Sequence, residues 1–217
     1  HNPMVLTFTP ILFVWVLFWI WQTYKFKIKL IIPIVIKLFF SGLLSASLAA
    51  FFTIPVLAET KLVQIGTMFT GYYSFSAHFA SLKQMFLSNF WGDGGSIWGP
   101  NDGMSFMIGY IFWILAILIV LYFFFSSLKN KKIDQKLLLS FLLIAIGFGT
   151  AFLSHERSTF IWNLIIPIQK VQFPWRFLNH TTFLFSLSIG VIPYILKNHF
   201  SSKNIIFINI FILIILF

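Results

Sequence analysis

The sequence predicts an all-α, polytopic membrane protein, a bundle of about six transmembrane helices that forms one membrane domain over residues 1–217. Of the 217 residues, 59% are hydrophobic and 9% are charged, and the mean hydropathy is +0.93. Soluble domains carry roughly a quarter of charged residues, so fifteen basic and five acidic side chains are too few to cover a water-facing surface of this size. This composition excludes a soluble enzyme, and the absence of cysteine excludes a disulfide-bonded secreted scaffold.

Six apolar runs define the predicted spans. Five approach or reach the roughly 20 residues that a helix needs to cross a bilayer, and each should be helical because lipid offers no partner for an open backbone. They cover residues 4–21, 38–57, 104–125, 137–153 and 177–196, with a shorter sixth run over 205–217. Because the chain begins at His1 without a methionine and stops inside that sixth run, we expect it to be an internal part of a longer protein.

Lysines mark one predicted side of the membrane. They crowd three short connections, at residues 25–37, 129–136 and 197–203. Two longer connections, 59–103 and 154–176, hold four of the five acidic residues. Since basic loops stay in the cytoplasm, the two longer ones are predicted to be extracytoplasmic. Orientation and anionic lipid then explain the net charge of +10 better than nucleic acid does, so the expected partner is the bilayer.

The first outer loop, 59–103, is too long to be a plain connector. Residues 77–90 carry aromatic and aliphatic side chains at helical spacing, which predicts an interfacial helix that begins after Ser76. A glycine-rich stretch follows, with polar and stacking groups at Trp91, Asp93 and Asp102. This stretch is either a tight cluster of turns or a place where backbone N–H groups come close to a ligand. It lacks the alternating acidic spacing of an EF-hand calcium loop.

The second outer loop, 154–176, predicts a short interfacial helix that Ser158 caps and that ends near Pro167. Its last residue, Arg176, stands beside Trp175 at the start of the fifth span. An arginine here is either an interfacial anchor or a bidentate ligand of a lipid phosphate or diphosphate.

Other polar groups of the outer side are less specific. Glu59 either pairs with Lys61 in water or faces the same cavity as the arginine. Three scattered histidines, at positions 78, 155 and 180, lack the paired spacing of a metal site, so no metal ligands are predicted.

Several motifs together resemble a known family. They are Phe52–Glu59, Trp91–Ser96 with Asp102–Phe106, and, most specifically, Gln172–Leu178, which reads Gln-Phe-Pro-Trp-Arg-Phe-Leu. These segments resemble the bacterial integral membrane proteins named "6-pyruvoyl-tetrahydropterin synthase-related membrane protein". That family is similar in turn to the GT-C glycosyltransferases, including the YfhO-like proteins. The pterin name implies no pterin chemistry here, because the sequence supplies no compact three-histidine zinc site.

The resemblance implies a multi-pass protein of the bacterial cell membrane that transfers a sugar from a polyprenyl-phosphate donor on the extracytoplasmic side. GT-C enzymes carry their catalytic acidic residue in an earlier outer loop, so the resemblance places the catalytic base outside this chain. It leaves a substrate-binding set here, with a divalent cation as an open question: Glu59, Trp91, Asp93, Asp102, Gln172, Trp175 and Arg176. The alternative is a non-catalytic scaffold or transporter of a lipid-linked precursor, which would need a polar path through the spans.

Overall fold

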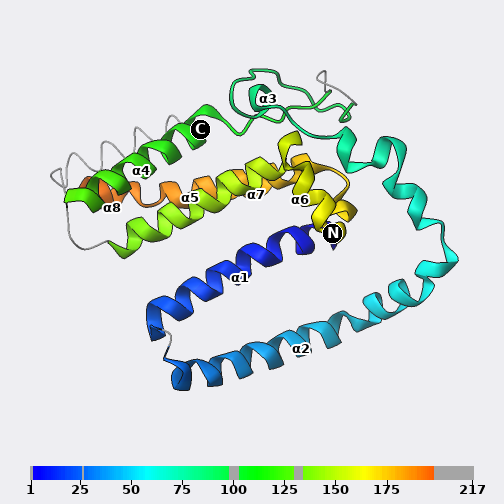
Figure 1. Ribbon diagram of the computed structural model, residues 1–217, viewed down its shortest axis with the longest axis horizontal. Coiled ribbons are helices and arrows are strands. Elements are labelled where there is room, and N and C mark those ends of the chain that lie inside the picture. The colour runs from blue at the N-terminus through cyan, green and yellow to red at the C-terminus, as the bar shows by residue number, and fades with distance from the viewer. Residues whose placement is uncertain (1, 26, 98–102, 130–133, 198–217) are drawn as a thin grey trace. The chain divides into compact units, whose positions relative to one another are not determined.

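The computed structural model describes residues 2–25, 27–97, 103–129 and 134–197, which are helical apart from loops and one isolated β-bridge (Figure 1). Within these ranges, five helical segments are long and apolar enough to cross a membrane. The chain is therefore a multi-pass membrane protein. The α-helices are α1 Asn2–Tyr24, α2 Ile28–Glu59, α3 Leu82–Phe86, α4 Tyr110–Lys129, α5 Gln135–Leu153, α6 Thr159–Leu164, α7 Phe177–Ile189 and α8 Ile192–Lys197.

The chain divides into two compact units, residues 1–73 and 74–217. The first contains α1 and α2, joined through Lys25, whose φ of 46° turns the backbone between them. Both helices are longer than the predicted spans 4–21 and 38–57, and α2 takes in the apolar residues before Lys37. None of the residues of α2 is buried within the described part of the chain, as expected for a helix solvated by lipid.

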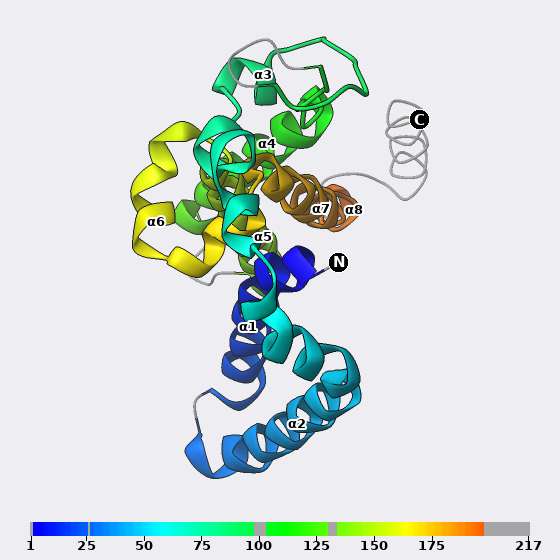
Figure 2. The ribbon, with the colours of Figure 1, turned by 90° about the vertical axis from the view of Figure 1, so that its right-hand side faces the viewer.

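The second unit is built on α4, α5 and α7, which run side by side (Figure 2). Alternating chain direction brings the loop before α4 and the loop between α5 and α7 to the same end of these helices. Short 3₁₀ turns shape both loops, at Phe75–Ala77, Glu156–Ser158, Ile166–Val171 and Pro174–Arg176. Three more follow α2 in the first unit, at Thr60–Leu62, Ile65–Phe69 and Gly71–Tyr73.

Two predictions about the first outer loop are wrong. The predicted third span, 104–125, begins at Tyr110 instead, because residues before it run in non-helical backbone: the Ile108 N–H donates to the Met85 carbonyl at 3.0 Å and Gly109 has a φ of +95°. The predicted helix over 77–90 shrinks to α3, capped by Ser81, whose hydroxyl accepts from Gln84 N at 3.2 Å. Hydropathy and spacing do not separate a buried loop from a helix.

The predicted fifth span, 177–196, is divided into α7 and α8. Proline lacks an N–H, and its ring clashes with the carbonyl four residues earlier. For Pro193 that carbonyl belongs to Ile189, where α7 ends. Val191 N then bonds the Ser188 carbonyl at 3.1 Å, a tighter turn than the α-helix makes. α5 covers the predicted fourth span, 137–153, and ends with it at Leu153, whereas the predicted sixth, 205–217, lies outside the described residues.

Asp134 begins α5 and links it to α8. Its Oδ1 accepts from Lys136 N at 2.8 Å and Leu137 N at 3.2 Å, and its Oδ2 accepts from the Tyr194 hydroxyl. Partial burial acts to raise the pKa of Asp134, but these hydrogen bonds and the charge of Lys136 outweigh it and hold that pKa below its usual value. The carboxylate therefore stabilises this end above its ordinary pKa, and the contribution disappears as the pH falls through the lowered value.

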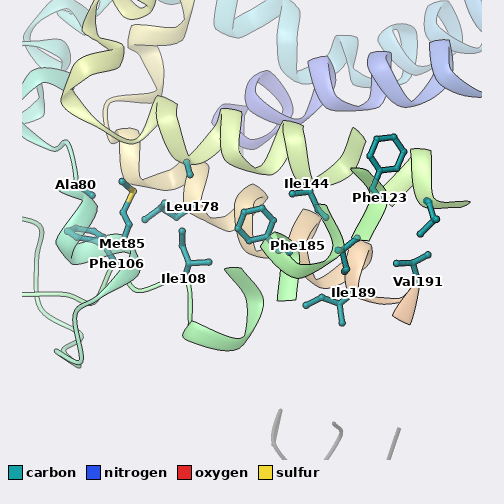
Figure 3. Close-up of a cluster of buried hydrophobic side chains, with 14 residues drawn as sticks. Ala80, Met85, Phe106, Ile108, Phe123, Ile144, Leu178, Phe185, Ile189 and Val191 are labelled. Atoms are coloured by element: carbon teal, nitrogen blue, oxygen red, sulfur yellow. The ribbon is translucent and has the colours of Figure 1, made fainter. Parts of the chain in front are cut away.

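Close packing of α5 on α7 forms the centre of the second unit. Figure 3 shows the core running from Met85 of the first outer loop past Leu178 and Phe185 to Val191. A Cβ built on Gly147 of α5 would lie 2.6 Å from Phe185 Cε1. Small residues permit this approach, which drives helix association in lipid through van der Waals contact.

We therefore expect Gly147→Ala to destabilise the protein by about 1–3 kcal/mol, because the ring of Phe185 is fully buried and has little room to move. Gly149→Ala is the matched control on the same helix, since nothing lies within 4 Å of its added Cβ. Unfolding by sodium dodecyl sulfate in mixed micelles measures both. Equal stability of the two variants would contradict the close approach of α5 and α7.

Candidate functional site

Ser154 joins three segments at the end of the second unit where the loop before α4 meets the loop between α5 and α7. It is fully buried, and its hydroxyl donates to the Pro174 carbonyl at 3.0 Å, just before α7 begins. Its own carbonyl accepts from Ala80 N, in the first outer loop, at 2.9 Å. The end of α5, the first outer loop and the start of α7 are thus tied together by groups that have no water to compete for them.

A strained turn precedes Arg176. Gln172 has φ 66° and ψ −44°, and Phe173 N donates across it to the Val171 carbonyl at 2.8 Å. This is a γ-turn of the positive-φ type, which is rare and strained in residues other than glycine. Such a conformation costs about 1–3 kcal/mol and persists only where its surroundings hold it.

Arg176 helps to hold this turn. Its Nη1 donates to the Val171 carbonyl at 2.8 Å, so that carbonyl accepts from both the backbone and the guanidinium group. Arg176 is half-buried, and among the residues that the structure describes no carboxylate forms an ion pair with it. A guanidinium group has five N–H donors. A partly buried cation with unused donors and no counter-ion is suited to bind an anion.

Aromatic rings surround the guanidinium group. Its central carbon lies 4.7 Å from the ring centroid of Phe173 and 5.9 Å from that of Trp175. The Trp175 indole also contacts Phe106 of the first outer loop, and its Nε1 is buried with no hydrogen-bond partner among the described residues. Indole N–H groups usually find a partner when buried. These contacts place the guanidinium group of Arg176 in an aromatic setting.

The glycine-rich stretch forms a narrow ribbon, here called the glycine ribbon, in which residues 92–95 pair with residues 103–105. Gly94 N donates to the Gly103 carbonyl at 2.8 Å, and Ser105 N donates to the Gly92 carbonyl at 3.0 Å. A Cβ on Gly92 would lie 2.5 Å from the Gly103 oxygen, so the two backbones leave no room for side chains. Close approach of the two backbones, which neither predicted explanation named, accounts for these glycines.

A buried histidine connects the glycine ribbon to the arginine. Ser96, which follows the ribbon's first strand, has its hydroxyl 2.9 Å from His78 Nδ1, and both residues are buried. The His78 ring packs on Phe173, with 4.6 Å between centroids, and Phe173 in turn packs on Arg176. Side chains in direct contact therefore connect the glycine ribbon to the guanidinium group.

The structure brings together three of the residues predicted to bind substrate, Gln172, Trp175 and Arg176. Trp91 is 88% exposed, and Asp93 lies next to it on the glycine ribbon, also exposed. Glu59 ends α2 in the first unit and is exposed. Asp102 lies outside the described residues.

Sequence reasoning missed the supporting residues His78, Ser96 and Ser154. Their contacts join positions 18 to 74 residues apart, so no local pattern predicts these contacts, although Ser96 lies inside the motif from Trp91 to Ser96. Phe173 had a signal, because it lies inside the block from Gln172 to Leu178. No group of three His, Asp or Glu side chains that could hold a metal ion occurs among the described residues.

No model of a known protein family, no curated protein and no solved structure matches this chain. The family resemblance of its motifs therefore stays a prediction.

We expect Ser96→Ala to loosen the glycine ribbon, because it leaves His78 Nδ1 buried without this partner. Loss of about 1.4 kcal/mol corresponds to roughly tenfold more frequent opening, so chymotrypsin should cleave near Trp91 about tenfold faster. Ser76→Ala, in an exposed hydroxyl pair with Ser74, is the control and should leave the rate unchanged. Cleavage of Ser96→Ala at the wild-type rate would contradict the claim that the contact with His78 stabilises the glycine ribbon.

Proposed function

We propose that this chain is the membrane part of a GT-C-like glycosyltransferase, in which Arg176 binds the phosphate of a polyprenyl-phosphate sugar donor. The observation that carries the proposal is the half-buried guanidinium group of Arg176, which has no carboxylate partner among the described residues and is held in place by the turn at Gln172. A phosphate accepts two parallel N–H bonds from such a fork.

The position of Arg176 along the chain favours an anion carried by a lipid. α7 begins at the next residue and continues as an apolar helix within a candidate span, which supports a position for the guanidinium group near the boundary of the bilayer core. A lipid-linked phosphate reaches this level while its prenyl chain stays in hydrocarbon. The resemblance of the Gln172–Leu178 block to the bacterial membrane-protein family supports the same donor.

In the proposed reaction an acceptor hydroxyl attacks the anomeric carbon of the sugar as the bond from that carbon to the phosphate oxygen breaks. The leaving phosphate gains negative charge, and Arg176 stabilises that charge in a site shielded from water by Phe173 and Trp175. The acceptor proton passes to a base that this proposal assigns to no described residue.

The remaining predicted residues are proposed to serve the acceptor side. Trp91, exposed beside the glycine ribbon, offers an indole face to a sugar, and Asp93 offers a carboxylate to its hydroxyls or to a divalent cation. Asp102 and Glu59 keep the same proposed role. The lysine distribution supports an extracytoplasmic position for these loops in a bacterial cell membrane.

A transporter is less well supported. It would need polar side chains facing a path through the spans. Three buried hydroxyls of α5 and α7 instead bond within the bundle: Thr150 Oγ1 lies 2.9 Å from Thr181 Oγ1, and Ser188 donates to the Phe185 carbonyl at 2.7 Å. These groups are occupied by protein partners, which favours the transferase over the transporter.

We expect Arg176→Ala to weaken binding of undecaprenyl phosphate about 10- to 100-fold, the equivalent of one charge-assisted contact of about 1.5–3 kcal/mol. Arg176→Lys should recover only part of this affinity, because an ammonium group is a point charge without the planar fork. Binding is measured on the chain in lipid nanodiscs, with undecaprenol as the uncharged ligand that neither substitution should affect.

A control in the other outer loop is Lys83→Ala, which also removes one exposed positive charge. Lys83→Ala should bind undecaprenyl phosphate as the unmodified chain does. An Arg176→Ala variant with unchanged helicity and unchanged affinity for undecaprenyl phosphate would refute the phosphate-binding role.

A further inference from the structure

The second outer loop presents a row of exposed apolar side chains. They lie on α6 and on the turn that follows it, and Leu164 is 79% exposed. The others are Phe160, Ile165 and Ile166, all exposed. Single exposed apolar residues are ordinary, but a contiguous row on a short segment marks a surface that contacts something other than water.

The opposite face of this segment is fixed to the protein. Trp162 is fully buried and stacks on Phe75, with 5.1 Å between ring centroids, and its Nε1 donates to the Leu153 carbonyl at 3.1 Å. Gln169 Nε2 donates back to the Trp162 carbonyl at 2.9 Å. These contacts set the rotation of α6, so the exposed row cannot turn inward without breaking them.

The row continues the lipid-facing surface of a span. The Phe160 ring lies 6.4 Å from the ring of Phe152, an exposed residue in the last turn of α5. The loop that carries the row leaves α5 after Leu153 and enters α7 at Phe177, so both of its ends are at the bilayer boundary. An amphipathic segment at this depth has its apolar face at the boundary of headgroups and acyl chains.

Basic side chains flank the row. Arg157 precedes it and Lys170 follows it, both exposed, and Glu156 is the one acidic residue between positions 156 and 170. Two positive charges against one negative charge favour an anionic surface over a neutral one. Each basic residue near such a surface shifts the docking equilibrium by about fivefold.

We propose that residues 157–170 form a membrane-surface anchor that docks on anionic phospholipid headgroups, with Phe160, Leu164 and Ile166 entering the acyl boundary. This anchor lies beside the turn that holds Arg176 and fixes the depth of the second outer loop in the membrane. The inference rests on the exposed row, its contact with Phe152 and its flanking charges, and it is independent of the proposed sugar transfer.

Because the chain has no cysteine, a single labelled cysteine tests the anchor. Leu164→Cys carrying the fluorophore NBD is reconstituted in phosphatidylcholine vesicles with and without phosphatidylglycerol. We expect acyl-brominated lipid to quench the label strongly and aqueous iodide to quench it weakly. Lys83→Cys, exposed on α3 in the other loop, is the control and should show the reverse order.

The charge requirement is tested by combining Arg157→Gln and Lys170→Gln in the labelled chain. We expect the ratio of docked to undocked label in phosphatidylglycerol vesicles to fall about fivefold for each charge removed, with helicity unchanged. A label open to iodide in both vesicles, or one shielded from both quenchers by protein, would overturn the anchor. Unchanged docking in the double variant would overturn the selection for anionic lipid.

Discussion

The buried hydroxyl group of Ser154 is the contact on which the outer end of the second unit depends. The Ser154 hydroxyl donates to the Pro174 carbonyl, and the Ser154 carbonyl accepts from Ala80 N. Two loops that are distant in sequence are therefore both bonded to the end of α5. The close packing of α5 on α7 at Gly147 fixes the position of Ser154 at the end of α5. Without the Ser154 contacts, the helices would still pack, but the first outer loop and the turn before Arg176 would no longer be held to the end of α5.

Arg176 is a half-buried cation with no carboxylate partner among the described residues. A carboxylate partner would neutralise the charge, and full burial would make it too costly to maintain. Instead, one guanidinium N–H donates to the Val171 carbonyl, and aromatic rings lie beside the group. The strain at Gln172 is observed directly in its positive φ, and strained residues of this kind cluster at functional sites.

The spans could be predicted from sequence because a helix in lipid satisfies its own backbone, which makes its signal local. α5 ends at Leu153 as predicted. Residues 104–109 are apolar because they pack in the core of a loop, and hydropathy does not distinguish such a segment from a membrane span. The site divides in the same way. Trp175 and Arg176 belong to one short block and were predicted, but the contact between His78 and Ser96 depends on the tertiary fold and left no local pattern.

Hydrogen exchange in Ser154→Ala tests the central claim most directly. If the Ser154 hydroxyl holds the turn before α7, the amides of Phe173 and Arg176 should exchange about tenfold faster, as expected for loss of about 1.4 kcal/mol of local stability. Ser188→Ala removes an equally buried hydroxyl whose hydrogen bond among the described residues stays within α7, and it should leave those two amides unchanged. Wild-type exchange at Phe173 and Arg176 in Ser154→Ala would contradict the account.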